Sequence, residues 1–93
     1  MAILISPAGK MNKISPQNGT TFTADELHTL VDGYLECVYL RDGRIMWINE
    51  EGKLQGLQPN MIATFLALKV LQRGDLIVGN AVITSLAEAG EEP

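Results

Sequence analysis

The 93-residue chain contains one cysteine, Cys37, and one histidine, His28. A single cysteine cannot form a disulfide within the chain, and such sparing use of cysteine is typical of a reducing cytosol. Metal centres need several His, Cys or carboxylate ligands in one place, and a catalytic nucleophile needs an adjacent base. Because the sequence gathers no such groups, we assign no metal ligand, no cofactor and no catalytic residue.

Basic residues and long apolar runs are also scarce. Seven Lys and Arg stand against eleven Asp and Glu, which gives a net charge of −4. General nucleic-acid binding needs a basic footprint, so the composition disfavours it. The longest strongly apolar run, residues 61–71, is too short to cross a bilayer, and the first residues lack the basic region of a signal peptide. We therefore expect no membrane association and a cytoplasmic location.

Hydrophobic residues make up 46% of the chain, which favours a folded globular protein. The length is enough for one domain with a modest core. We predict a single domain over residues 1–87. The remaining residues, 88–93, include Glu88, Glu91 and Glu92 and are expected to form an acidic, flexible tail.

The strongest local pattern is Asp42-Gly43 between two β-rich runs. This dipeptide favours a two-residue type I′ turn, which pairs Leu40 with Ile45 and places Glu36 opposite Asn49. Alternation along the two strands then gives one face of the hairpin a mixed apolar and polar character. That face would carry Glu36, Val38, Leu40, Ile45, Trp47 and Asn49.

The expected Glu36–Asn49 pair admits two interpretations. A carboxylate beside an amide can share a hydrogen bond that only holds the strand register. Alternatively, a partly buried polar pair near Trp47 can contact a ligand.

Two strands and a helix are predicted before the hairpin. Residues 2–6 read as a strand covered on both faces, and residues 11–15 as a short return strand. Thr23 and Glu26 form a capping box, so a helix is expected over residues 24–32. Gly33 follows as a residue that can adopt the left-handed conformation.

A second helix and a last strand follow the hairpin. Asn60 or Pro59 can begin the helix, which runs to about Gln72 and is apolar almost all round. Gly74 would end the helix, and residues 76–86 would hold the last strand, interrupted at Gly79.

The resulting order, β(β)αββαβ, predicts an α+β fold built as a two-layer sandwich. A ferredoxin-like arrangement is the first choice. A rolled antiparallel sheet is the alternative, because Gly74 and Gly79 would permit strong curvature.

A set of short motifs spans most of the chain. In order they read Gly-Tyr-Leu-Glu from residue 33, Asn-Glu-Glu-Gly-Lys-Leu from 49, Gly-Leu-x-Pro-Asn from 56 and Gly-Asp-x-Ile-Val-Gly from 74. This pattern resembles a small family of domains of unknown function found in phages, prophages and conjugative elements. The resemblance implies an accessory protein in the cytosol of a host bacterium. Its signature positions here are Glu36, Asn49, Glu50, Gly52 and Asn60.

Our leading functional hypothesis is a small non-enzymatic binding protein of a mobile element. It would bind a host protein or sequester a small polar, nucleotide-like ligand, and so antagonise host defence. The candidate ligand contacts are Glu36, Trp47, Asn49, Glu50 and Asn60. The alternatives are a hydrolase-like enzyme with Glu36 as general base and Asn49 orienting it, or a purely structural module.

Self-association is also expected, as a homodimer or a higher assembly. The hairpin has two apolar faces, and one sheet can bury only about half of an apolar helix. One candidate surface is formed by Trp47, Val38, Leu40 and Ile45. The other is the flank around Phe65, Leu68 and Gln72.

Overall fold

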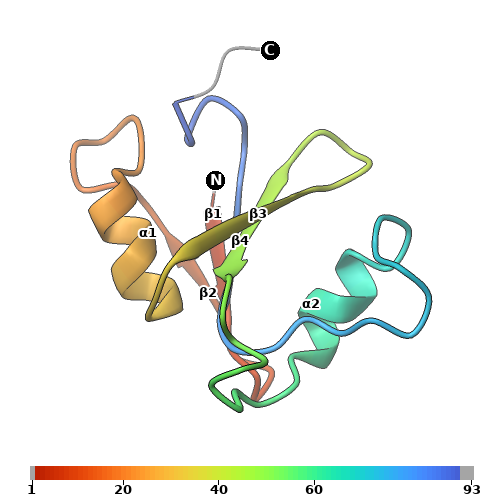
Figure 1. Ribbon diagram of the computed structural model, residues 1–93. Helices are drawn as coiled ribbons and strands as arrows, with labels where there is room; N and C mark the ends of the chain where they lie inside the picture. Colours follow the sequence, from red (N-terminus) through yellow and green to blue (C-terminus); the bar gives the residue numbers. More distant parts are fainter. Residues whose placement is uncertain (1, 91–93) are drawn as a thin grey trace.

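The computed structural model describes residues 2–90, which form one five-stranded antiparallel sheet and two short helices (Figure 1). The elements are β1 (Ala2–Ile5), β2 (Met11–Ile14), α1 (Ala24–Val31), β3 (Leu35–Tyr39), β4 (Ile45–Asn49), α2 (Met61–Leu66) and β5 (Ala81–Thr84). The predicted α+β class is confirmed.

The strand order is β2-β1-β5-β4-β3, and every neighbouring pair is antiparallel. A ferredoxin-like sheet contains split βαβ units, whose helix joins two parallel strands. Here α2 joins β4 to β5, which are antiparallel neighbours, and α1 joins β2 to β3, which lie at opposite edges of the sheet. The arrangement is therefore the antiparallel alternative, in an open sheet. The last strand, β5, is in the middle of the sheet, and all four of its residues are buried.

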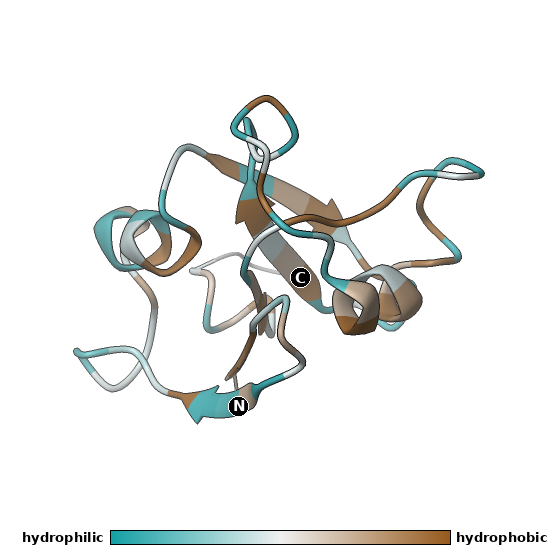
Figure 2. Ribbon diagram, turned by 90° about the horizontal axis from the view of Figure 1, so that it is seen from below, coloured by the Kyte–Doolittle hydropathy of each residue, from teal (hydrophilic) through white to brown (hydrophobic). Residues whose placement is uncertain are grey.

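The two helices cover opposite faces of the sheet, and each face has its own core (Figure 1). The core on the α2 side includes Ile5, Met46, Ile48, Ala63, Ala67, Ile77, Ala81 and Ile83. The core on the α1 side consists of Ala2, Phe22, Leu27, Val31 and Val82. Hydrophobic residues concentrate in the central strands, whereas the edge strand β2 is largely hydrophilic (Figure 2). Each helix thus packs on one face of the sheet as the expected helix-on-sheet layer, and both faces of the sheet are covered.

The capping box of α1 is present, because the Thr23 hydroxyl accepts from the Glu26 N–H and the Glu26 carboxylate accepts from the Thr23 N–H. The left-handed residue at the other end is Asp32, with φ 60°, and not Gly33 as predicted. Near the end of the chain, the Glu88 carbonyl accepts from the Phe22 N–H at 2.8 Å, so packed structure extends at least to this residue. Glu91 and Glu92, the rest of the predicted acidic tail, lie outside the described residues.

Helix α2 is shorter than predicted, because it ends at Leu66 and not near Gln72. Asn60 is its N-cap, as expected, with a side-chain oxygen that accepts from the Ala63 N–H. Tight turns continue beyond the helix, including a hydrogen bond from the Val70 N–H to the Ala67 carbonyl.

The β3–β4 hairpin differs from the prediction by one residue. The Leu40 N–H donates to the Arg44 carbonyl and the Gly43 N–H to the Leu40 carbonyl, which closes a three-residue loop. Gly43 has φ +91°, whereas Asp42 is not among the residues with positive φ, so the loop is a type I turn followed by a glycine bulge. The Asp42 carboxylate accepts from the Arg44 N–H at 3.0 Å and pairs with its guanidinium, which favours this loop over the type I′ turn.

The new register changes which residues share a face. Glu36 is opposite Ile48, and Asn49 is opposite Leu35. Because the side-chain period of a strand is two, a shift of one residue moves Glu36 and Asn49 to opposite faces of the sheet. The predicted Glu36–Asn49 pair is therefore wrong.

This loop can be tested at its glycine. Gly43→Ala should reduce the free energy of unfolding by about 1–2 kcal/mol, because alanine is strained at a positive φ. A Cβ at this position would meet no atom within 4 Å, so the cost should come from backbone conformation alone. Asn tolerates the left-handed region, and Gly43→Asn should cost less than Gly43→Ala in urea unfolding. Equal costs for the two variants would contradict the assigned loop.

Candidate functional site

The five residues predicted to contact a ligand do not form one site. Asn49 and Asn60 are buried, Trp47 is half-buried, and Glu36 and Glu50 are exposed. Glu36, Glu50 and one side of Asn49 border a shallow hollow of about 220 Å³, beside the Lys53–Asp75 ion pair. Asn49 is no longer available to orient Glu36 as a general base, because the two side chains lie on opposite faces.

Asn49 joins the end of α1 to the end of the hairpin. Its amide nitrogen donates to the Asp32 carbonyl at 3.0 Å and to the Gln55 side chain at 3.1 Å. Its amide oxygen accepts from the Glu51 N–H at 2.8 Å. A Cβ on Gly33 would overlap the Asn49 side chain, so this glycine is needed for close approach and not for a left-handed backbone. The side chain is fully used within the fold.

Asn60 plays a similar part on the other face of the sheet. Its amide nitrogen donates to the carbonyl of Ile5 at 2.9 Å and to that of Gly79 at 2.8 Å. Its amide oxygen caps α2 through the Ala63 N–H at 3.1 Å. This fully buried side chain therefore holds together the end of β1, the start of α2 and the turn before β5.

Thr64 extends this network. Its hydroxyl donates to the Asn60 carbonyl at 2.8 Å and accepts from the Ile77 N–H at 2.9 Å. The signal that could have revealed it is a small polar residue four positions after a cap.

Trp47 is also satisfied within the fold. Its indole N–H donates to the Thr84 hydroxyl at 3.1 Å, and its ring packs against the core on the α1 side. Of the predicted site residues, Trp47, Asn49 and Asn60 are thus structural in their observed contacts.

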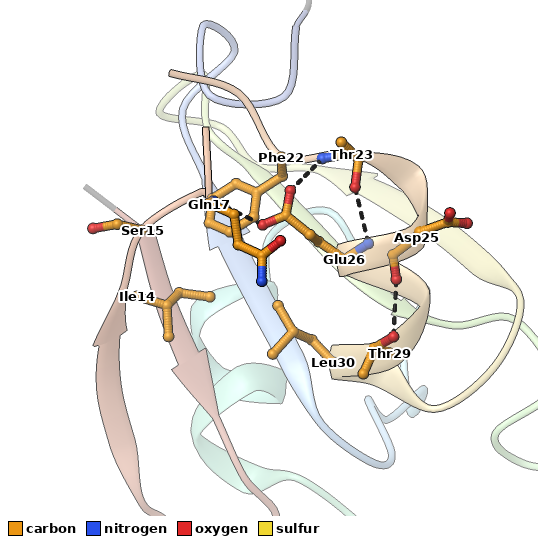
Figure 3. Close-up of a pocket in the computed structure, with 9 residues that line it drawn as sticks. All are labelled: Ile14, Ser15, Gln17, Phe22, Thr23, Asp25, Glu26, Thr29 and Leu30. Atoms are coloured by element: carbon orange, nitrogen blue, oxygen red, sulfur yellow. Dashed lines mark hydrogen bonds between the residues drawn. The ribbon is translucent and has the colours of Figure 1, made fainter. Parts of the chain in front are cut away.

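A hollow of about 550 Å³ lies between the end of β2 and α1 (Figure 3). Ile14 and Leu30 extend into it from opposite sides, and Phe22 lies above them. The Glu26 carboxylate beside it accepts from the N–H groups of Thr23 and Gln17, each at 2.9 Å. The hydrogen bond from Thr23 and then that from Gln17 hold the pKa of Glu26 below its usual value. These polar groups serve the loop and the helix start.

A different surface lies over α2 and the turns after it. Met61 and Phe65, one helical turn apart in α2, are 60% and 73% exposed, and Leu68 in the turn after the helix is 58% exposed. Together with the flanking Leu66 and Val70, we call these five residues the α2 surface. It adjoins a hollow of about 380 Å³ between α2 and the hairpin tip, whose polar lining includes Arg41, Asp42 and Lys69.

Two further findings bear on the chemistry of the site. Within residues 2–90, no three His, Cys, Asp or Glu side chains gather as a metal ion would require. Over the same residues, no helix is long and apolar enough to cross a membrane.

The buried amide of Asn60 gives a prediction for stability. Asn60→Asp should reduce the free energy of unfolding at pH 7 by about 3 kcal/mol, because a carboxylate would replace a donor that faces two carbonyl oxygens. That site raises the folded-state pKa of the introduced carboxyl above its unfolded value of about 3.9. The loss of stability should therefore shrink as pH falls through the folded-state pKa toward the unfolded value. Asn60→Ala should also destabilise, without this pH dependence. Urea unfolding at several pH values separates the two.

The Glu26 hydrogen bonds give a second prediction. A carboxyl with a lowered folded-state pKa contributes stability above its unfolded pKa and loses that contribution as pH falls through the folded value. The melting temperature of Glu26→Gln should be lower than that of the parent at pH 7, and this difference should narrow as pH falls below 4.5. Asp25→Asn, which removes a charge from the same helix turn but not these two hydrogen bonds, is the control. A gap for Glu26→Gln that is constant with pH would refute this account.

The chain was compared with protein families, curated proteins and solved structures. Neither the curated proteins nor the solved structures contain a match. One family model matches residues 1–93, the full length of the chain. The chain belongs to the family described as Domain of unknown function (DUF3846).

Proposed function

We propose that the protein is a small non-enzymatic binding protein that docks a protein of its host on the α2 surface. One observation carries this proposal: α2 is reversed relative to an ordinary amphipathic helix. The buried positions of the helix and its C-cap hold the small Ala63, Thr64 and Ala67, and Ile62 is only partly buried. Met61 and Phe65, and Leu68 just after the helix, are exposed. Large apolar side chains that gather on a surface normally mark an interaction site.

The α2 surface is held in place by contacts that do not involve its outward side chains. Asn60 caps the helix and Thr64 ties it to Ile77. Ala63 and Ala67 pack into the core on that side of the sheet. Removing the outward side chains would therefore leave these contacts in place, and a surface held in this way loses little further freedom on binding.

A host protein as the partner is supported by the motifs that resemble a family of phages, prophages and conjugative elements. An accessory protein of such an element acts in the cytosol of its host, and antagonism of a defence protein is a role that needs binding but no catalysis. The runner-up, an enzyme with Glu36 as general base, has lost the expected contact with Asn49.

Self-association was predicted from two surfaces, and only one of them is accessible. Leu40 and Ile45 are buried, and Trp47 and Val38 pack against the two cores. The flank around Phe65, Leu68 and Gln72 is exposed, as part of or beside the α2 surface. A second copy is thus a competing occupant of that surface, and the experiment must separate it from a host protein.

Site-specific photo-crosslinking in the bacterium that carries the gene tests the proposal. With a benzophenone amino acid in place of Phe65, we expect a discrete crosslinked product with a host protein. The same amino acid in place of Tyr34, an aromatic residue that is 66% exposed and remote from α2 in sequence, is the control. Adding Leu68→Glu should remove the product, because a charge is costly in an apolar contact.

The outcomes separate the possible occupants. A product with the mass of two copies of the chain would replace the host protein by a homodimer. No product from position 65, or the same products from position 34, would overturn the proposal.

A further inference from the structure

We propose that the hollow beside the α2 surface recognises an acidic, apolar segment of the partner protein. This inference rests on the proposed function and specifies its partner. The base of the hollow is apolar, with Leu40 and Ala67 nearly fully buried. Its sides include Phe65, Leu68 and Val70, which are all exposed. A hollow of about 380 Å³ is large enough to receive apolar side chains of a short amphipathic segment.

The charges around this hollow favour a partner segment with negative charge. Arg41 and Lys69 line it, are exposed, and form no ion pair with any residue in the range 2–90. Asp42, the one carboxylate in the lining, is engaged by the Arg44 guanidinium at 2.8 Å. The hydrogen bond from the Arg44 side chain lowers the pKa of Asp42, which stays ionised and paired. The free charge at the hollow is therefore positive, although the whole chain carries −4.

The same charges disfavour a second copy as the occupant. A two-fold contact brings the same surface of both subunits together. Arg41 and Lys69 of the two copies would then face a surface that offers no free carboxylate in return. Such a juxtaposition of like charges is costly, whereas carboxylates of a partner segment would be complementary.

A bilayer fits this surface less well than a segment of protein. Helices that lie in the membrane interface present a continuous apolar face to the bilayer and a strongly charged opposite face to water. Here the helix has six residues and the apolar side chains border a hollow. Anionic vesicles remain a useful competing probe.

Binding of two synthetic peptides to the full chain tests the inference. Both have about 14 residues, roughly four helical turns, and share Leu and Phe at i, i+4 and i+7. One carries Glu and the other Lys at the remaining positions. In fluorescence anisotropy, the Glu peptide should bind about tenfold more tightly than the Lys peptide, and added salt should weaken its binding.

Charge reversal provides a matched pair of variants. Arg41→Glu with Lys69→Glu should abolish the preference for the Glu peptide. Lys10→Glu with Lys13→Glu changes the net charge equally and should leave the preference unchanged. Both residues are exposed and lie just before or in β2, the edge strand opposite to β3 of the hairpin. Phe65→Ser should weaken binding of the Glu peptide, and circular dichroism should confirm that each variant is folded.

Each outcome decides a different point. Equal affinity for the two peptides, or no binding of the Glu peptide, would overturn the acidic assignment. So would a stable dimer in sedimentation that Phe65→Ser disrupts, or binding only to vesicles that contain phosphatidylglycerol. A host protein crosslinked through position 65 together with no binding of the Glu peptide would leave the proposed function standing and remove this inference alone.

Discussion

The buried amide of Asn60 is the contact on which the α2 side of the fold depends. Its three hydrogen bonds reach β1, α2 and the turn before β5, which are far apart in sequence. Without them, two carbonyl oxygens and one N–H would be left in a region that water does not reach, at a cost of about 1–3 kcal/mol each. Asn49 does the same for the end of α1 on the opposite face. The buried side chains of Asn60 and Asn49, which we call the two polar clamps, thus support a sheet of short strands.

This arrangement explains how a helix of six residues can be held with so little apolar burial. Asn60 and Thr64 hold α2 by hydrogen bonds. Its apolar packing on the core can therefore rest on Ala63, Ala67 and the partly buried Ile62. Small residues let the helix approach the strands. Met61, Phe65 and Leu68 are then left on the outside, where the fold does not need them. Their presence there calls for an explanation other than packing.

Local patterns in the sequence predicted much of the fold, because capping and turn chemistry act over a few residues. The capping box at Thr23 and Glu26 and the cap at Asn60 are both present. The hairpin register could not be decided in this way, because Asp42-Gly43 suits both a type I′ turn and a type I turn with a glycine bulge. The outcome depended on the Arg44 hydrogen bonds to Asp42, and one residue of register decided the face of Glu36.

The candidate site was less predictable, because burial and strand order are set by contacts between distant residues. Nothing local shows that β5 lies between β1 and β4, or that Leu40 and Ile45 are buried while Phe65 stays exposed. The polar residues that stood out in the sequence, Asn49 and Asn60, proved to be clamps. Phe65 and Leu68, which belong to one of the two surfaces predicted for self-association, are exposed.

The residues that hold the fold together are therefore different from the residues proposed to bind a partner. The clamps use polar groups whose replacement should disturb the fold. The α2 surface uses apolar groups whose replacement should leave the clamps intact. A net charge of −4 helps such a protein to stay soluble despite an exposed apolar surface. The free cations Arg41 and Lys69 beside that surface then give it a local sign opposite to that of the whole chain, so that long-range repulsion between copies and short-range attraction to an acidic partner act together.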